Sequence, residues 1–161
     1  MPRTDPFQPA DDPARAIARD LMDTATFASL AVIQPGRTAP SVTRIACTTD
    51  TQGVLVSLIS QLSTHTAALE ANPACALLLG EPGEKGDPLT HPRLTLHCTA
   101  RFLDRSSPEH AALRARYLSL RPKAKLYVDF ADFRFVRFQI ADGLLNGGFG
   151  KAFLLKPSDL T

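Results

Sequence analysis

Hydrophobic and polar residues alternate along much of this chain, a pattern that predicts a mainly β protein. Turns rich in Gly, Pro, Asn and Asp separate the short apolar runs. The predicted strands cover residues 27–33, 41–49, 54–60, 74–80, 93–104, 133–140, 144–145 and 152–155. Short turns between successive strands favour antiparallel pairing. About six to eight strands in one small domain predict a closed or half-closed β-barrel.

Three helices are predicted among these strands, and they make the fold a β-barrel with inserted helices. They are expected at about 12–23, between Ser63 and Asn72, and at about 107–120. Acidic residues and Pro13 begin the first helix. Pro73 ends the second, because the residue before proline avoids the helical conformation. Helices and strands do not alternate regularly, which disfavours a doubly wound parallel sheet.

The apolar positions of segment 133–140 change phase within the predicted strand. Phe133 and Phe135 point to one face, whereas Val136 and Phe138 point to the other. Such a change indicates either a β-bulge or a strand that is covered on both faces. The pattern leaves both alternatives open.

Domain organisation is simple. Residues 1–12 are rich in proline and polar side chains, so we expect a flexible N-terminal arm. Residues 13–161 then form a single domain. Segment 81–92 holds two glycines, three prolines and four charged residues, and this loop is long enough to have a function of its own. The glycine-rich segment 146–150 either approaches a flat ligand closely or forms a flexible hairpin turn.

Composition excludes several classes of protein. The formal net charge is +2 and the basic residues are scattered, which argues against nucleic-acid binding. No apolar run approaches the roughly 20 residues of a membrane span, and the N-terminus lacks the apolar core of a signal peptide. We therefore expect a cytoplasmic protein that binds neither nucleic acid nor membrane.

The reactive side chains suggest no catalytic group. The three cysteines are widely spaced in apolar or alternating runs, which predicts buried reduced thiols. The four histidines, His65, His91, His97 and His110, match no zinc pattern, and no Gly-x-Ser-x-Gly motif is present. The sequence therefore predicts no metal centre and no catalytic triad.

An anion site is predicted at the start of the second helix. The first N–H groups of a helix lack intrahelical partners and lie at the positive end of its dipole. Ser63, Thr64 and Thr66 add hydroxyl donors, and His65 adds a charged donor when protonated. A phosphate is the usual occupant of such a site. On spacing alone, a simple N-cap by Ser63 or Thr64 is the favoured alternative.

Arg44 is a second candidate for anion binding. It lies in the middle of the predicted strand 41–49, where a guanidinium needs a partner. A phosphate could be that partner, bound by two N–H groups of the fork. The alternative is an arginine on a wet face or one that protects an edge strand. The two interpretations are about equally supported by the sequence.

Taken together, these segments resemble the pyridoxamine 5′-phosphate oxidase-like family, which has an FMN-binding split β-barrel. The branch that includes haem-utilisation proteins is the most similar. The resemblance extends from about residue 14 to residue 155. It is carried, in this order, by segments 41–46, 62–66, 72–78, 92–96 and 127–133.

This resemblance implies an FMN site. Arg44 and Ser63–Thr66 stand where the family holds the FMN phosphate. The resemblance places the backbone of Ile45 and Ala46 along the flavin ring. It also places Ser60 near the ribityl chain and Arg93 at a further flavin contact. The family usually forms homodimers, with two flavins in the subunit interface.

Two departures from the family's motifs narrow the expected function. The oxidase proper has an Arg-Lys pair where this chain has Thr64 and His65. It also has a late Arg-x-His motif, and no histidine follows His110 here. The resemblance therefore implies an FMN-binding flavoprotein, as an oxidoreductase whose substrate and catalytic residues the sequence does not specify. The alternative is a haem-binding or haem-utilisation protein that uses the same cleft, with or without catalysis.

Overall fold

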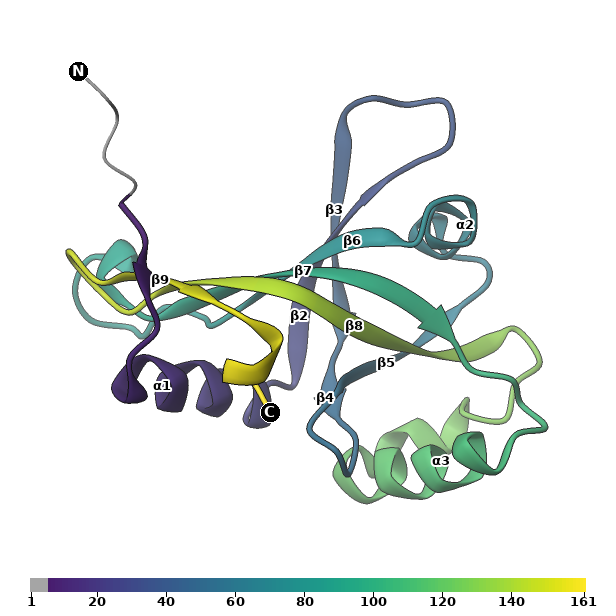
Figure 1. Cartoon of the computed structure of the whole chain (residues 1–161). Coiled ribbons are helices and arrows are strands. Elements are labelled where there is room, and N and C mark those ends of the chain that lie inside the picture. The colour runs from purple at the N-terminus through teal and green to yellow at the C-terminus, as the bar shows by residue number, and fades with distance from the viewer. Residues whose placement is uncertain (1–5) are drawn as a thin grey trace.

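The computed structural model describes residues 6–161 and shows a strongly bent antiparallel sheet with three α-helices (Figure 1). The strands are β1 (Gln8–Pro9), β2 (Phe27–Ile33), β3 (Pro40–Ala46), β4 (Thr48–Thr49), β5 (Leu55–Ser60), β6 (Ala74–Leu79), β7 (Arg93–Phe102), β8 (Phe133–Asn146) and β9 (Ala152–Leu155). The helices are α1 (Asp12–Asp23), α2 (Thr64–Ala71) and α3 (Pro108–Leu120), with 3₁₀ turns at Pro88–Thr90, Pro122–Leu126 and Pro157–Asp159. The predicted fold class, mainly β with inserted helices, is confirmed.

The strand order is β1-β9-β8-β7-β6-β2-β3, and β5 joins the sheet through β8 on one side and pairs with β4 on the other. All pairs among the described residues are antiparallel except β1 with β9. This exception lies in the predicted N-terminal arm, where Gln8 and Pro9 align with Phe153 and Leu154. Residues 1–5 of the predicted arm lie outside the described residues.

Two predicted strand boundaries are wrong. Segment 41–49 is interrupted at Cys47, because β3 pairs with β2 whereas β4 pairs with β5. Segments 133–140 and 144–145 form one strand, β8, which pairs with β7 over most of its length. Gly143, within β8, is a point of close packing: a Cβ there would lie 3.1 Å from the Leu96 side chain.

The phase change in β8 arises because the strand is covered on both faces. Val136 and Phe138 belong to the main core inside the barrel, whereas Phe135 belongs to a second core under α3. The bulge that was the other alternative lies further along the strand, where the register shifts opposite His97 and Cys98. Strand β8 therefore connects the two cores.

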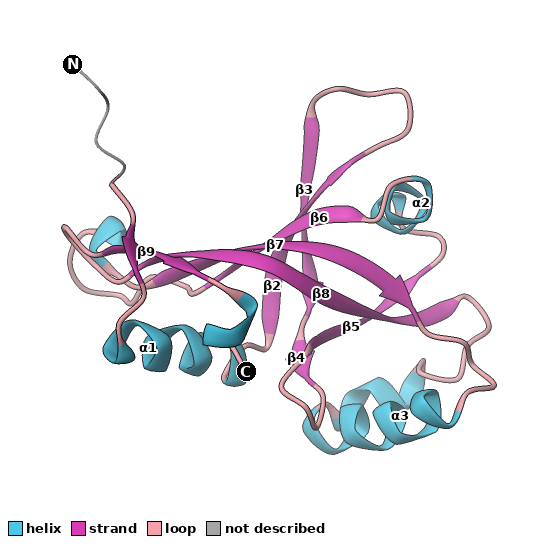
Figure 2. Cartoon of the chain, in the orientation of Figure 1, coloured by secondary structure: helices cyan, strands magenta, loops and turns pink. Residues whose placement is uncertain are grey.

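The helices leave one face of the sheet uncovered. In the view of Figure 2, α1 and α3 both lie below the sheet, and α2 packs beside the end of β6. Between α2 and the turn that joins β8 to β9, no α-helix of the described residues lies above the middle of β6 and β7 in this view. The odd-numbered residues of β7 from Arg93 to Thr99 point to this uncovered face, where they are exposed or half-buried.

Candidate functional site

The N-terminus of α2 begins directly after β5 and is not capped by a side chain. Ser63 occupies the N-cap position with extended backbone, but its hydroxyl makes no capping hydrogen bond. The Thr66 N–H donates to the Ser63 carbonyl at 3.0 Å. Within residues 6–161, the N–H groups of Thr64 and His65 have no acceptor. These donors remain available to an anion, so the simple N-cap alternative does not describe Ser63 or Thr64.

Two of the hydroxyls predicted to contact the ligand form hydrogen bonds within the protein instead. The Ser60 hydroxyl donates to the Asp132 carboxylate at 2.7 Å and accepts from the Leu62 N–H at 3.1 Å. Thr66 is buried, and its hydroxyl donates to the Ser60 carbonyl at 2.6 Å. These bonds hold the chain between β5 and α2 in place. Ser60 and Thr66 therefore shape the helix start, and the hydroxyls of Ser63 and Thr64 are the ones left near its surface.

His65 lies in the first turn of α2 and is half-buried. Its Nε2 atom is buried and has no hydrogen-bond partner among the described residues. Burial lowers the pKa of the imidazole below its usual value, because it disfavours the charged form. A bound anion would offset this cost, so His65 is a donor that a phosphate could recruit.

Arg44 lies on the exposed side of β3, where its guanidinium stacks 5.0 Å above the centre of the Phe27 ring. Its register partner on β2 is Ser29. In the described part of the chain, Arg44 forms no ion pair. The arginine is thus held by an aromatic ring and keeps its N–H donors free.

Ile45 and Ala46 lie on the last strand of the sheet order, with β2 on one side. The Ile45 side chain is buried in the main core, and the Ala46 carbonyl accepts from the Ser57 hydroxyl at 2.6 Å. Their backbone on the opposite edge from β2 belongs to no paired strand of the described sheet. That edge suits the backbone contacts that the family resemblance implies.

Arg93 is not close to Arg44. Ser29, Leu78 and Thr95 continue the row of Arg44 across β2, β6 and β7. Arg93 lies two residues before Thr95, so three strand spacings, or roughly 14 Å measured along the sheet, lie between the strands of the two arginines. The Arg93 guanidinium donates to the Leu89 carbonyl at 3.0 Å. Arg93 and Arg44 therefore lie on strands that are not neighbours in the sheet.

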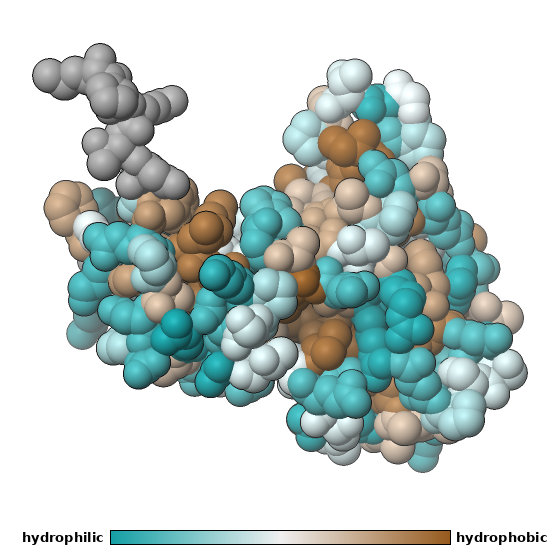
Figure 3. Space-filling model, in the orientation of Figure 1, coloured by the Kyte–Doolittle hydropathy of each residue, from teal (hydrophilic) through white to brown (hydrophobic). Residues whose placement is uncertain are grey.

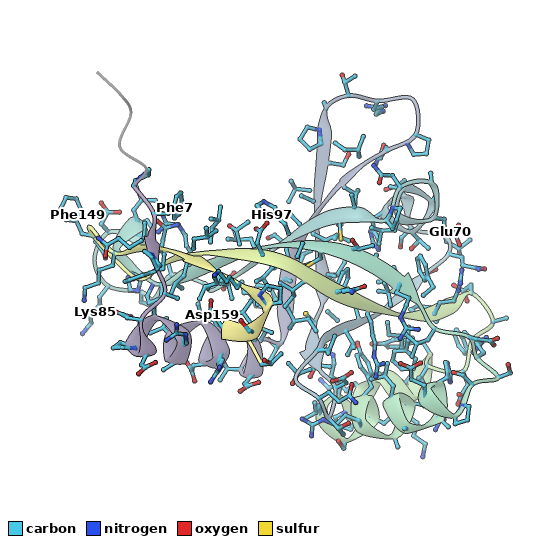
Figure 4. All side chains as sticks on the ribbon, viewed as in Figure 1. Phe7, Glu70, Lys85, His97, Phe149 and Asp159 are labelled. Carbon is cyan, nitrogen blue, oxygen red and sulfur yellow. The ribbon has the colours of Figure 1, made fainter. Side chains whose placement is uncertain are left out.

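A hydrogen-bonded pair that the sequence did not suggest lies on the uncovered face. His97 Nδ1 and Asp142 Oδ1 are 2.5 Å apart, and both side chains are about half exposed. Figure 4 shows His97 on the side of β7 that faces away from α1. The alternation along β7 places His97 on the polar face, but the pairing with Asp142 depends on the β7–β8 register. The two residues are 45 positions apart in the sequence, so local patterns do not reveal this pair.

A second missed cluster surrounds the buried carboxylate of Asp50. Asp50 accepts hydrogen bonds from the N–H groups of Gln52 and Val54 at 2.8 and 3.0 Å, which closes the turn between β4 and β5. Its other oxygen lies 2.7 Å from the Arg137 guanidinium. Arg137 also pairs with Glu109 on α3. The sequence showed only scattered charges at these positions, because the residues come from three separate elements.

The cysteines are free thiols, as predicted. Cys47 and Cys98 are buried and Cys75 is half-buried. Burial raises the pKa of Cys47 to about 12 and that of Cys75 to about 11. These thiols stay protonated at neutral pH and are poor nucleophiles. Among residues 6–161, no group of three His, Cys, Asp or Glu side chains could hold a metal ion.

Among the described residues, no helix is both long and apolar enough to cross a bilayer.

A curated protein is similar to much of this chain. The non-canonical, chloroplastic heme oxygenase HOZ of Arabidopsis thaliana is 37% identical over 119 residues, which cover 74% of this chain and 35% of that protein. The chain thus spans about a third of the length of this curated relative.

Two solved structures are similar over nearly the whole chain. The protein Atu2129 of Agrobacterium tumefaciens, of unknown function, is 32% identical with a TM-score of 0.80, over 94% of this chain and 61% of that one. A heme binding protein from Mycobacterium smegmatis is 23% identical with a TM-score of 0.82, over 96% of this chain and 61% of that one. At 23% identity, the second likeness concerns the fold alone.

The sequence profile of the family described as "CREG, beta-barrel" matches residues 9–159. This range includes every strand from β2 to β9 and all three α-helices. The expected resemblance to split-barrel proteins of the pyridoxamine 5′-phosphate oxidase type is confirmed. The chain belongs to the CREG beta-barrel family, whose fold is the split β-barrel.

Proposed function

We propose that this protein binds FMN, with the phosphate at the N-terminus of α2. The observation that supports this proposal most strongly is the uncapped helix start, where the unpartnered Nε2 of His65 lies in the first turn. The N–H groups of Thr64 and His65, with the hydroxyls of Ser63 and Thr64, supply donors of the kind that bind phosphate. Arg44, which has no carboxylate partner in the described chain, supplies a cation for the same anionic ligand.

Strands β3 and β5 supply the other contacts of the proposed FMN site. The backbone edge of β3 at Ile45 and Ala46 would contact the ring, and the Ser60–Asp132 hydrogen bond orients the loop that leads to the phosphate. The flavin supplies two-electron redox chemistry when it is bound. The protein is thus proposed to act as a flavin-dependent oxidoreductase, in which these residues hold and orient the cofactor. Arg93, engaged by Leu89 and distant from Arg44, is not included in this site.

Haem is the second candidate ligand. The observation that favours it is the 37% identity to the heme oxygenase HOZ, together with a heme binding protein among the similar folds. Haem is a planar ligand with two carboxylates, so the free donors of Arg44 and the α2 N-terminus suit it as well. FMN is the first proposal because the uncapped N-terminus of α2 supplies donors of the kind that bind phosphate.

We also propose that two chains associate through the uncovered face of the sheet. Leu78, Thr95, Leu144 and Leu154 form one row across β6, β7, β8 and β9. Leu78 and Leu154 are 42% and 45% exposed, and Val42 on β3 is 67% exposed. Large apolar side chains gathered on one face are typical of an interaction surface. A homodimer through this face would place the cofactor sites at the edges of the interface.

The test is spectroscopic. Purified protein is mixed with FMN or, separately, with haem, passed through a gel-filtration column, and its absorption spectrum is recorded. We expect a flavin spectrum to remain with the protein. A Soret band alone would support the second candidate and contradict the first.

A double variant tests the proposed phosphate site. Arg44→Ala combined with His65→Ala should weaken FMN binding by about a hundredfold, since each charged hydrogen bond contributes about 1.5–3 kcal/mol. The matched control is Arg37→Ala with His91→Ala, which removes an exposed arginine and a loop histidine. Equal FMN affinities for the two double variants, measured by quenching of flavin fluorescence, would rule out this site.

A further inference from the structure

Strand β8 has a gap in its pairing on one side. Strand β5 pairs with residues 133–137 of β8, and β9 pairs with residues 143–146. Between them, residues 138–142 pair only with β7, so one edge of β8 is open. A cavity of about 380 Å³ lies beside this gap, between the β4–β5 turn and the C-terminal residues. Figure 3 shows a hollow with apolar side chains between the two lobes of the molecule.

The walls of this cavity, which we call the gap cavity, are largely apolar. Its apolar lining residues are Met22, Val54, Phe138, Ile140, Pro157 and Leu160. Met22, Phe138 and Leu160 belong to the main core, so these walls are held in place by packing. Cavities of this size and composition are typical of sites for small organic molecules.

Two arginines lie side by side at the polar end of the gap cavity. Arg101 on β7 and Arg137 on β8 are direct register partners, and both line the cavity. Like charges directly opposite each other destabilise a sheet unless anions offset them. Asp50 and Glu109 provide two such anions: Asp50 lies 2.7 Å from Arg137, and Glu109 lies 2.8 Å from Arg101 and also pairs with Arg137.

These two carboxylates do not line the gap cavity. Together with Arg116, they line a neighbouring cavity, which shares Gln52 and Arg137 with the gap cavity. No Asp or Glu side chain is among the residues that line the gap cavity. The Nε atom of Arg137 is buried and has no hydrogen-bond partner within residues 6–161. Each guanidinium has five N–H donors, so both arginines keep donors that the carboxylates do not use.

We propose that the gap cavity binds an amphipathic organic anion, a molecule with an apolar aromatic or alkyl body and one acidic group. The apolar walls would bury the body, and the guanidiniums of Arg101 and Arg137 would bind the acidic group. The gap cavity shares no lining residue with the proposed FMN site. The inference is therefore independent of FMN or haem binding.

Two fluorescent probes of the same shape test this proposal. 1-Anilinonaphthalene-8-sulfonate carries an anionic group, whereas N-phenyl-1-naphthylamine has the same skeleton without it. Each probe is titrated into the full-length protein, with and without saturating FMN. We expect one saturable site per chain for both probes, tighter binding of the sulfonate, and no displacement by FMN. Displacement by FMN, or the absence of saturable binding, would overturn the proposal.

Single variants test separately the arginines and the apolar walls of the gap cavity. Arg101→Gln removes a half-exposed arginine and should weaken sulfonate binding about tenfold while leaving the neutral probe unchanged. Ile140→Trp should fill the cavity and abolish binding of both probes. Arg37→Gln, in the exposed turn after β2, is the matched control and should change neither. The proposal fails if Arg101→Gln weakens both probes equally or acts no differently from Arg37→Gln. Because Arg101 is exposed, this outcome remains readable even if Ile140→Trp does not fold.

Discussion

At the scale of single residues, the four hydroxyl side chains around α2 have two different roles. Those of Ser60 and Thr66 form hydrogen bonds inside the fold, whereas those of Ser63 and Thr64 make no capping bond. The residue types are alike, so the sequence presented them as one cluster. Burial and the direction of each hydroxyl separate them, and only the second pair is available to a ligand.

A valine substitution distinguishes the two roles. Thr66→Val removes the 2.6 Å bond to the Ser60 carbonyl and should lower the free energy of unfolding by about 1–2 kcal/mol. Thr64→Val, at an exposed position in the same helix, should change it by less than about 0.5 kcal/mol. Urea denaturation followed by circular dichroism measures both. Similar losses for the two variants would contradict the internal role of Thr66.

His65 should couple FMN binding to pH. Its pKa is lowered by burial, so the free protein holds the neutral imidazole at neutral pH, and a bound phosphate would favour the protonated form. Binding would then take up a proton, and FMN affinity relative to His65→Gln should rise as pH falls from about 8 to 6. The titration of the phosphate itself affects both proteins and cancels in the ratio. Flavin-fluorescence titrations at several pH values measure the ratio of the FMN affinities of the wild-type protein and His65→Gln. A ratio that stays constant with pH would contradict the proposed role of His65.

At the scale of elements, β8 organises the molecule because it belongs to both cores. One of its faces carries Val136 and Phe138 into the barrel, and the other carries Phe135 into the second core. The ring of Phe135 makes edge contacts with His110 and Tyr117 of α3, with ring centres 5.2 and 5.3 Å away. These contacts fasten α3 to the outside of the barrel.

Truncation of this ring should be costly. Phe135→Ala should reduce the free energy of unfolding by about 3–5 kcal/mol, because it leaves a cavity between β8 and α3. Phe149→Ala, at a position that is 96% exposed, should change it by less than about 0.5 kcal/mol. Thermal and urea unfolding of both variants test this, and a loss below about 1 kcal/mol for Phe135→Ala would show that α3 is held mainly by other contacts.

At the scale of the whole molecule, one face of the sheet carries exposed aliphatic side chains on several strands. It carries Leu78 and Leu154 in one row and the His97–Asp142 pair beside them. A sheet face with several exposed aliphatic side chains is typical of a protein that associates. The proposed homodimer accounts for this face.

Charge placed on that face should prevent association. Leu78→Arg, at the β6 end of the row, should convert the dimer to a monomer, because burying an unpaired charge in an interface costs several kcal/mol. Leu89→Arg, at a 67% exposed position in the loop before β7, is the control and should leave the dimer intact. Sedimentation velocity gives the oligomeric state. A dimer that persists in Leu78→Arg, or a monomeric wild-type chain, would contradict the proposal.

Local patterns were enough to predict the fold class, the helix at 12–23 and the end of α2 at Pro73, because alternation, caps and proline act on neighbouring residues. Local patterns also identified Arg44 and Ser63–Thr66 as candidates for anion binding. Only strand pairing brought His97 to Asp142 and left β8 open between β5 and β9. Such contacts depend on the register of segments far apart in the chain, and a shift of one residue would reverse the faces.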